Sequence, residues 1–435
     1  MSSRDHTPRP PGADARPAEA SPPVGGSYLG LLRRNRDFAL FFAAVVISLI
    51  GDWFLVVALL DLVLELTGKA SLATLVVVAF NLPVFLVSPW AGAQADRMDR
   101  RRLMITVDIC RAVAALLPLL ATTPGRLPLA YLGMALISLG SAYFDPAADA
   151  AVPNLVAKED LGRANALLGS AWGTTMAAGS AIGGLVTTHF GRDTSIVINS
   201  LSFVGSVCLL LLVKRRFSED ATAARPQQAF IAATREAIDY ARSRPRVVAL
   251  LLGKSGYCLA AGVVALLGVF GREHFAQSSG LSGAGGISAL YVARGLGAVL
   301  GPFLLRGLVR DGDRMNAAIA PCIALFATGY LLLSLNLGYG ISLACVLLGH
   351  VGGGAEWMAS TYGLQREVPD ELRGRIFAVD YGLATLGISL SSLAAGALAD
   401  AYGATHVAFL MSMLSVALAG IWLLWSYRLW DLKSR

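Results

Sequence analysis

Ten ionisable residues lie inside long apolar stretches of the sequence. An ionisable residue at such a position costs roughly 2.5–3.5 kcal/mol on scales for insertion into a lipid bilayer, so each needs a partner or a role. Carboxylates and histidine in this setting can carry protons, and a carboxylate can attract a cationic substrate. The ten are Asp52, Asp61, Glu65, Asp108, Arg111, Lys254, Arg294, His350, Glu356 and Asp380.

The position of a charge along its apolar stretch gives its expected depth in the membrane, and this depth suggests roles for three of the ten residues. Asp52 lies near the middle of its stretch, which makes it a candidate proton carrier. A structural hydrogen bond near Gly51 is the competing interpretation of equal weight. Lys254 and Glu356 lie at similar distances from the same end of their stretches, which predicts a direct ion pair between them.

His350 lies near the middle of its own apolar stretch, beside Gly349 and the glycines 352–354. Glycines at this position leave room for a substrate or permit a helix bend. The imidazole can titrate near neutral pH, and an uncharged, hydrogen-bonded histidine is equally compatible with the sequence. Tyr257 and Trp357 are candidates for aromatic contacts with a substrate.

Spacing favours structural roles for several other charges. Asp108 and Arg111 are three residues apart, which predicts an ion pair on one helix face. Asp61 and Glu65 lie near the end of their stretch and are expected to be solvated acids. Asp380 and Arg294 are expected to stabilise the interface between the N-terminal and C-terminal halves of the chain.

The composition requires a membrane setting for these residues. The chain has 435 residues, of which 55% are hydrophobic and 15% charged, whereas soluble proteins carry about 25% charged residues. This excludes a soluble enzyme and a disordered or fibrous protein. Twelve apolar stretches are long enough to span a bilayer, and each is expected to be a helix because lipid cannot satisfy the backbone. They cover residues 38–66, 70–94, 103–122, 127–149, 164–188, 194–213, 246–271, 285–309, 315–336, 339–362, 375–399 and 405–427.

Lysine and arginine predict the orientation. Of the 36 such residues, 29 flank the stretches on the side of the chain termini, four lie on the other side and three lie within stretches. Basic residues accumulate on the cytoplasmic side, so both termini are predicted to be cytoplasmic. This distribution accounts for the net charge of +7 without a nucleic-acid partner.

Two halves of the sequence repeat one design. A glycine followed four residues later by aspartate, with an Asp-Arg pair, occurs in 92–102 and again in 307–314. A Val-Pro turn with a later Gly and Arg occurs in 152–163 and in 368–375. Both pairs have nearly the same offset, which predicts parallel six-helix repeats. The expected divisions are a disordered tail 1–27, a bundle 28–213, a linker 214–245 with an amphipathic helix in 227–243, a bundle 246–427 and a tail 428–435.

These features resemble the major facilitator superfamily, whose loop signature is G-x-L-x-D-R-x-G-R-K/R. The matching residues are Gly92, Asp96, Arg97, Arg100 and Arg101, and the departures are Gln94 and Asp99. Other phrases are similar to the bacterial branch of drug and macrolide efflux proteins and enterobactin exporters. They are Gly51-Asp52, Leu66-Thr67-Gly68, Asp145-Pro146-Ala147 and Asn165-Ala166-Leu167.

The resemblance implies an all-α membrane protein with twelve transmembrane helices in two pseudo-symmetric six-helix bundles. The first, fourth, seventh and tenth spans are expected to line a central cavity. It also implies a conformational latch that stabilises the outward-facing state. In that latch Asp96 faces the start of span eleven near Arg375–Ala378, and Arg100 pairs with Asp145 or Asp149.

The resemblance further implies a secondary active transporter that exports small amphipathic, drug-like molecules by alternating access, in antiport with protons carried by Asp52 or Glu356. Two departures weaken the proton-coupled interpretation: span four has no internal arginine, for which Arg111 is the alternative, and Ser180 stands where exporters often have proline.

The alternatives are a lysophospholipid or siderophore transporter of the same fold and, more remotely, a non-transporting membrane sensor. The cytoplasmic loops carry no H-E-x-x-H, P-loop or nucleophile-elbow motif, so an enzyme is not expected. The cysteines lack metal-ligand spacing, and neither a metal nor a cofactor other than protons is expected. The expected partners are a small-molecule substrate and membrane lipid, and the expected state is a monomer.

Overall fold

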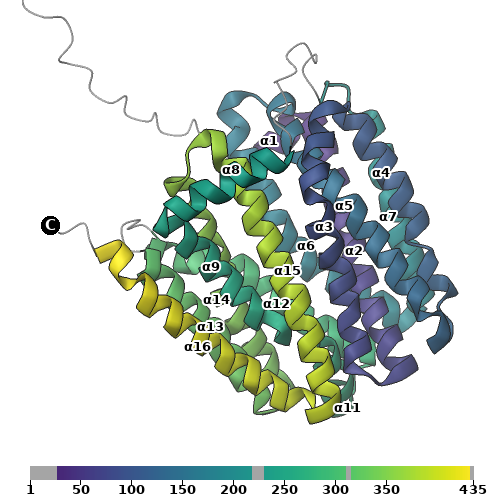
Figure 1. Cartoon of the computed structure of the whole chain (residues 1–435). Helices are drawn as coiled ribbons and strands as arrows, with labels where there is room; N and C mark the ends of the chain where they lie inside the picture. The colour runs from purple at the N-terminus through teal and green to yellow at the C-terminus, as the bar shows by residue number, and fades with distance from the viewer. Residues whose placement is uncertain (1–26, 218–229, 310–314, 432–435) are drawn as a thin grey trace, which may run out of the picture.

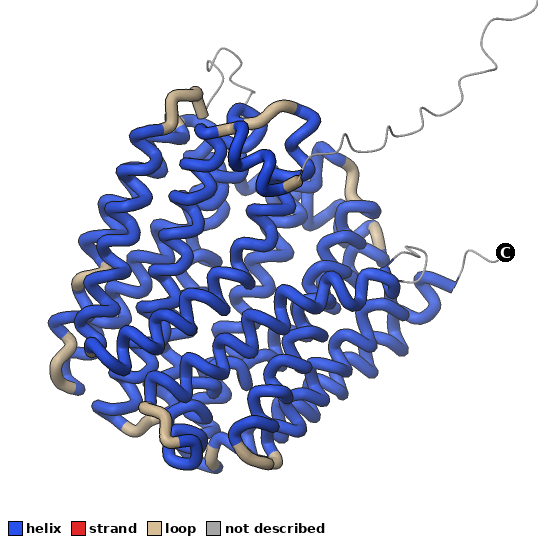
Figure 2. The backbone as a smooth tube through the Cα atoms, turned by 180° about the vertical axis from the view of Figure 1, so that it is seen from behind, coloured by secondary structure: helices blue, strands red, loops and turns tan. Residues whose placement is uncertain are grey.

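The computed structural model describes residues 27–217, 230–309 and 315–431. Within them it gives only the backbone at 88–89, 91–97, 230–234, 277–278, 306, 308–309, 370–371 and 431. Within these ranges the chain is helical and contains no strand. Figures 1 and 2 show the helices as two side-by-side groups of steeply inclined rods. The fold class predicted from the sequence, an all-helical membrane protein of two bundles, is confirmed.

The first bundle contains α2 to α7. The helix α2 packs against α6 and α7, and α5 packs against α3 and α4. A short helix, α1 (Tyr28–Arg34), precedes the bundle. The main helices are α2 (Arg36–Thr67), α3 (Ala70–Arg97), α4 (Arg100–Ala114), α5 (Leu127–Leu155), α6 (Leu161–Phe190) and α7 (Arg192–Leu212), and short 3-10 turns cover Leu117–Leu120, Pro124–Arg126 and Lys158–Asp160.

The second bundle contains α9 to α16. The helix α14 packs against α12 and α13, and α16 packs against α13 and α9. Its first span is divided into α9 (Pro245–Ala260), the 3-10 segment η4 (Ala261–Leu266), α10 (Leu267–Val269), the π-helical segment η5 (Phe270–Phe275) and α11 (Ala276–Ser279). The others are α12 (Gly283–Val309), α13 (Met315–Ser334), α14 (Tyr339–Glu367), α15 (Asp370–Tyr402) and α16 (Ala404–Asp431).

Eleven of the described helical segments are long and apolar enough to cross a membrane. They coincide with eleven of the twelve predicted stretches. The predicted stretch 164–188 coincides with α6, which is rich in Gly, Ser and Thr and is not among the eleven. Because α6 packs between α2 and α12, it is part of the bundle, and the count of twelve spans stays a prediction.

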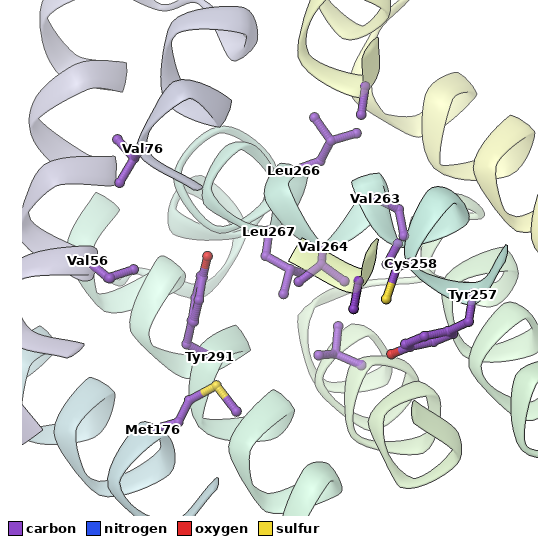
Figure 3. Packing of buried hydrophobic residues seen from close by; sticks show 14 of the residues in the cluster. Val56, Val76, Met176, Tyr257, Cys258, Val263, Val264, Leu266, Leu267 and Tyr291 are labelled. Carbon is purple, nitrogen blue, oxygen red and sulfur yellow. The ribbon is translucent and has the colours of Figure 1, made fainter. Parts of the chain in front are cut away.

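The bundles meet along two pairs of helices. The helix α3 of the first bundle lies against α15 of the second, and α6 lies against α12. Apolar side chains of both bundles form one buried core. Figure 3 shows Tyr291 in this core among Val56, Met176 and Leu267. This arrangement leaves the remaining faces of the helices directed outward, where apolar side chains such as Leu424 are exposed, as lipid contact requires.

The ends of the bundles form two faces. We call the face that carries α1 and the end of α16 the terminal face, and the face that carries the α2–α3 and α15–α16 connections the opposite face. At the α2–α3 connection, Gly68 ends α2 in the left-handed conformation with φ of 60°. Glycine adopts this conformation without a steric penalty, which explains the Leu66-Thr67-Gly68 phrase.

A helix in the connection between the bundles lies on the terminal face. This helix, α8 (Phe230–Ser243), falls within the predicted amphipathic segment 227–243. The Tyr240 hydroxyl donates to the carbonyl of Glu367, and the Arg375 guanidinium pairs with Glu236 at 2.5 Å. The linker helix is therefore attached to the ends of α14 and α15.

Candidate functional site

The first bundle has a buried group of three charges. The Arg111 guanidinium lies 3.0 Å from a carboxylate oxygen of Asp52 and 3.0 Å from one of Asp108, and all three side chains are buried. The Asp108–Arg111 pair predicted from spacing is confirmed. The guanidinium also lies 4.2 Å from the Phe203 ring centroid, so it is enclosed by carboxylates and an aromatic face.

Small residues give this group its space. A side-chain carbon at Gly140 would lie 2.6 Å from Cγ of Arg111. One at Gly51 would lie 2.0 Å from the Ser202 hydroxyl, so Gly51 allows α2 to approach α7 while the adjacent Asp52 reaches Arg111. The two adjacent residues therefore have different roles: Gly51 allows close packing of α2 and α7, and Asp52 forms an ion pair with Arg111.

The second bundle has its own buried group of three charges. Lys254 of α9 lies 2.5 Å from a carboxylate oxygen of Asp380 on α15 and 3.2 Å from the Thr361 hydroxyl. Its ammonium nitrogen also lies 4.5 Å from the Trp357 ring centroid. The predicted pair of Lys254 with Glu356 is therefore wrong, because α15 presents Asp380 to the lysine at hydrogen-bonding distance.

Glu356 is left as a buried carboxylate without a direct partner. Its side chain is 0% exposed, and neither carboxylate oxygen has a hydrogen-bond partner among the described residues. Lys254 and Asp380 act on it electrostatically. The group therefore holds two carboxylates and one cation, as the group around Arg111 does. A buried carboxylate in this position is costly unless it binds a proton or a cation.

The structure brings His350 and Tyr257 together through an aromatic cluster. The His350 Nε2 lies 2.8 Å from the Tyr330 hydroxyl, and its ring packs edge-on against Phe326. The Tyr257 ring lies 4.8 Å from the same Phe326 ring. A side-chain carbon at Gly353 would lie 2.5 Å from the Tyr257 hydroxyl, so this glycine provides the space that the tyrosine occupies.

The predicted latch is only partly within the described residues. At Gly92, Asp96 and Arg97 only the backbone is described, so the contact of the Asp96 side chain with the start of α15 stays a prediction.

Arg100 does not pair with Asp145 or Asp149 in this structure, and the pair, expected in the outward-facing state, stays a prediction. Arg100 donates instead to the carbonyls of Ala150 at 2.9 Å and Phe217 at 3.2 Å, and both aspartates are exposed. Arg101 donates to the carbonyl of Leu210 at 3.0 Å. The last carbonyls of a helix lack intrahelical partners, so Arg101 satisfies the end of α7.

Sequence reasoning missed an ion-pair network on the opposite face. Asp61 accepts a hydrogen bond from Arg272 and lies 3.8 Å from Arg192, and Glu65 lies 2.6 Å from Arg192 and 3.2 Å from Arg272. The prediction of a solvated acid is therefore wrong for Asp61, whose side chain is 9% exposed, whereas Glu65 is paired but remains 46% exposed. Arg192 and Arg272 are two of the four basic residues predicted on this side, and that scarcity was the available signal.

A second contact closes the same face. Asp400, at the end of α15, accepts from the backbone nitrogens of Ala70 at 2.7 Å and Ser71 at 3.2 Å, at the start of α3. A carboxylate is favoured at a helix N-terminus, where backbone donors are unsatisfied. Thr188 and Ser282 share a hydrogen bond of 2.6 Å nearby. The bundles are thus joined by polar contacts on the opposite face.

The terminal face differs. Between described residues of the two bundles, no hydrogen bond or ion pair is present near that face. Asp145 and Asp149 of α5 and Tyr381 of α15 are exposed. The bundles are therefore closed against each other on the opposite face, and acidic and aromatic side chains are accessible toward the terminal face.

The family model of the transmembrane secretion effectors, a family of the major facilitator superfamily, matches residues 29–434. The chain belongs to this family. The resemblance stated from the loop motifs is therefore confirmed, and the protein is a membrane transporter of the major facilitator type.

Similar proteins agree with this assignment. The multidrug efflux pump Tap of Mycolicibacterium fortuitum is 26% identical over 89% of this chain and 95% of its own length. An uncharacterised transporter of the same superfamily from Bacillus subtilis, YfiS, is 25% identical over 88% and 91%. Among solved structures, a POT family transporter has a TM-score of 0.72 at 12% identity, covering 90% of this chain and 96% of that chain. This likeness shows the fold.

Proposed function

We propose that this transporter exports small amphipathic molecules across the bacterial plasma membrane by alternating access, in antiport with protons. The family assignment and the similarity to a multidrug efflux pump support the export of drug-like compounds. The observation that carries the coupling is Glu356, a fully buried carboxylate with no hydrogen-bond partner among the described residues. The unit is proposed to be a monomer with membrane lipid around it.

The proposed orientation has both termini in the cytoplasm. The 29-to-4 distribution of basic residues supports it. In this orientation the terminal face is cytoplasmic, and the network of Asp61, Glu65, Arg192 and Arg272 closes the periplasmic side. The conformation is then inward-facing. A bacterial homologue of the lysosomal transporter Spinster, solved in an inward-facing state, has a TM-score of 0.67 at 13% identity, covering 94% of this chain and 97% of that chain.

Proton exchange would use the two buried groups of charge. A proton on Glu356 removes a charge beside the Lys254–Asp380 pair, and one on Asp52 releases a carboxylate from Arg111. Each event changes the net charge inside a bundle by one. Antiport would require that the inward-facing protein bind either the substrate or the proton, so that release of one accompanies binding of the other.

The loop after α3 is proposed to act in the other half of the cycle. There Gly92, Asp96 and Arg97 would contact α15 when the cytoplasmic side closes, while Arg100 and Arg101 keep the loop attached to α5 and α7. The connection 214–245 would link bundles 28–213 and 246–427 during this motion, with α8 attached to α14 and α15.

The test is transport by the purified full chain in proteoliposomes with an imposed pH gradient. Glu356→Gln is expected to abolish gradient-driven accumulation while leaving exchange of labelled substrate across the membrane intact. Asp52→Asn is expected to weaken coupling in the same way. Asp193→Asn, an exposed acid with no ion pair among the described residues, is the matched control.

Full gradient-driven transport by both Glu356→Gln and Asp52→Asn would contradict the coupling. Transport of lysolipid at full rate without any gradient would instead support the lysophospholipid alternative. Absence of exchange for every drug, siderophore and lysolipid, from protein with an unchanged melting temperature, would contradict the transporter of amphipathic molecules altogether.

A further inference from the structure

Arg294 occupies a central position at the interface of the two bundles. It lies 11 residues into α12, about 17 Å from the start of that helix. Its guanidinium carbon lies 5.9 Å from the Trp53 ring centroid, 5.8 Å from Trp172 and 5.5 Å from Tyr291. Trp53 and Trp172 belong to the first bundle, so three aromatic rings from both bundles frame one cation.

Arg294 differs from the other cations within the spans in having no acidic partner. Arg111 has Asp52 and Asp108, and Lys254 has Asp380, each within 3.0 Å. No carboxylate among residues 27–217, 230–309 and 315–431 forms an ion pair with Arg294, and its buried Nε has no hydrogen-bond partner there.

The buried carboxylates nearby do not neutralise the charge of Arg294. Asp52 interacts with Arg111, and Glu356 with Lys254. The side chains that Arg294 faces are those of Tyr291, Tyr330 and His350, none of which is a carboxylate. An uncompensated guanidinium in a low-dielectric interior attracts an anion strongly. Its planar fork matches the two oxygens of a carboxylate or phosphate.

The helix that carries Arg294 is fixed by close contacts on both sides. A side-chain carbon at Gly295 would lie 2.6 Å from the Ala177 nitrogen of α6. One at Gly297 would lie 2.4 Å from the Leu347 carbonyl of α14. These contacts hold the backbone of α12 against both neighbours, and the three aromatic rings confine the guanidinium itself, which lowers the entropy that binding would cost.

One wall of the frame is accessible. Trp172 is 43% exposed, whereas Trp53 is 4% and Tyr291 is 1% exposed. A flat apolar group can therefore stack on the exposed indole while a charged group approaches the guanidinium. Aromatic rings beside a charged fork suit a ligand that is apolar along its body and anionic at one point.

We propose that Arg294, framed by Trp53, Trp172 and Tyr291, binds the anionic group of the transported molecule. The substrate class is an aromatic or apolar amphiphile that carries a carboxylate or a phosphate. This inference rests on the proposed export of amphipathic molecules and narrows it to those with a negative charge. Free phosphate lacks the apolar body and binds weakly.

The test is isothermal titration calorimetry of the full chain in detergent with three probes of one shape. These are 1-naphthaleneacetate, its neutral amide and 1-naphthylmethylammonium. The wild type is expected to bind the acetate roughly tenfold to a hundredfold more tightly than the amide, and the ammonium more weakly than the amide. Inorganic phosphate is expected to give no saturable heat at millimolar concentration.

Arg294→Gln is expected to bring the affinities for the acetate and the amide within about threefold of each other, and Arg294→Lys to retain part of the preference. Arg366→Gln is the matched control, because Arg366 also lies over a tyrosine ring, 5.9 Å from the Tyr362 centroid, but is exposed at the end of α14. The probes also partition into detergent micelles, but this affects every variant equally, so it does not alter the comparison of their affinity ratios.

An unchanged preference for the acetate in Arg294→Gln would overturn the inference, and so would tighter binding of the ammonium by the wild type. A fall in melting temperature with an unchanged ratio of affinities would mark Arg294 as a structural residue and would overturn it too. These measurements need no transport. Charge-selective binding without export would contradict the proposed function alone, and export with a preference independent of Arg294 would contradict this inference alone.

Discussion

The Asp61 carboxylate offers the sharpest test of how the opposite face is closed. It accepts a hydrogen bond from Arg272 of the other bundle, and its side chain is 9% exposed while that of Arg272 is 24% exposed. Asp61→Asn removes the negative charge with almost no change in volume. The substitution therefore weakens the contact between the bundles and leaves the packing of α2 unchanged.

The free energy that the Asp61–Arg272 contact contributes can be worked out from how deeply the two side chains are buried. Hydrogen bonds to charged groups contribute about 1.5–3 kcal/mol, and fully exposed ion pairs contribute about 0–1 kcal/mol. Asp61 is nearly buried and Arg272 is partly exposed, so the contact is expected to stabilise the closed state by about 2 kcal/mol. The contact is absent when the bundles separate on this face. The fraction of molecules open there should then rise roughly 30-fold.

Labelling of a cysteine in place of Thr74 measures this fraction. Thr74 is 0% exposed, and a side-chain carbon at Gly396 of α15 would lie 2.1 Å from its hydroxyl, so it is covered until α3 and α15 separate. The background carries serine at the exposed Cys110 and Cys208. The rate of reaction with a membrane-impermeant maleimide should rise roughly 30-fold in Asp61→Asn, in proportion to the open fraction.

Asp193→Asn is the control on the same face, since Asp193 is exposed and has no ion pair among the described residues. It should label at the wild-type rate. Equal rates for Asp61→Asn and the wild type would refute the idea that this ion pair holds the bundles together. A rise in both variants would show that labelling responds to surface charge and not to opening.

Three further outcomes follow from the packing and charges. Lys254→Met should destabilise the protein by about 3–5 kcal/mol, because it leaves Asp380 buried and unpaired, and the double variant with Asp380→Asn should recover part of the lost melting temperature. Gly286→Ala should cost about 1–3 kcal/mol in chemical unfolding, since the added carbon would lie 2.1 Å from a backbone carbonyl of η5. Hydrogen bonds from two arginines lower the pKa of Asp160 below its ordinary 3.8, so its stabilisation is full above that value and is lost as pH falls through the lowered pKa. The melting temperatures of wild type and Asp160→Asn should therefore differ at pH 7 and converge in strong acid.

Local patterns in the sequence were sufficient for the helices and for pairs within one helix. Hydropathy located the spans, and the three-residue spacing of Asp108 and Arg111 gave their ion pair, since both side chains share one face of α4. The repeated loops and the phrase around Gly68 also identified the fold correctly. These features depend on residues that are neighbours along the chain.

Pairs between helices could not be predicted in the same way. Depth placed Lys254 and Glu356 at one level, but the rotation of each helix about its axis decides which side chains meet, and α15 turns Asp380 toward the lysine. Asp400 and Ala70 are 330 residues apart and meet only because α3 and α15 pack together. In the divided first span of the second bundle, the backbone at Gly262 likewise lies close to the Ser391 carbonyl of α15, a contact between residues far apart along the chain.

The composition of the two buried groups has an electrical consequence. Each holds two carboxylates and one cation, so each carries an excess negative charge when both carboxylates are ionised. The free energy of one elementary charge changes by about 2.3 kcal/mol per 100 mV when the charge crosses the whole membrane. In the proposed alternating-access cycle, rocking of the bundles would shift these charges within the field by part of that distance. The voltage of an energised membrane would then bias the inward- and outward-facing states, and each proton bound in the proposed antiport would remove part of that bias.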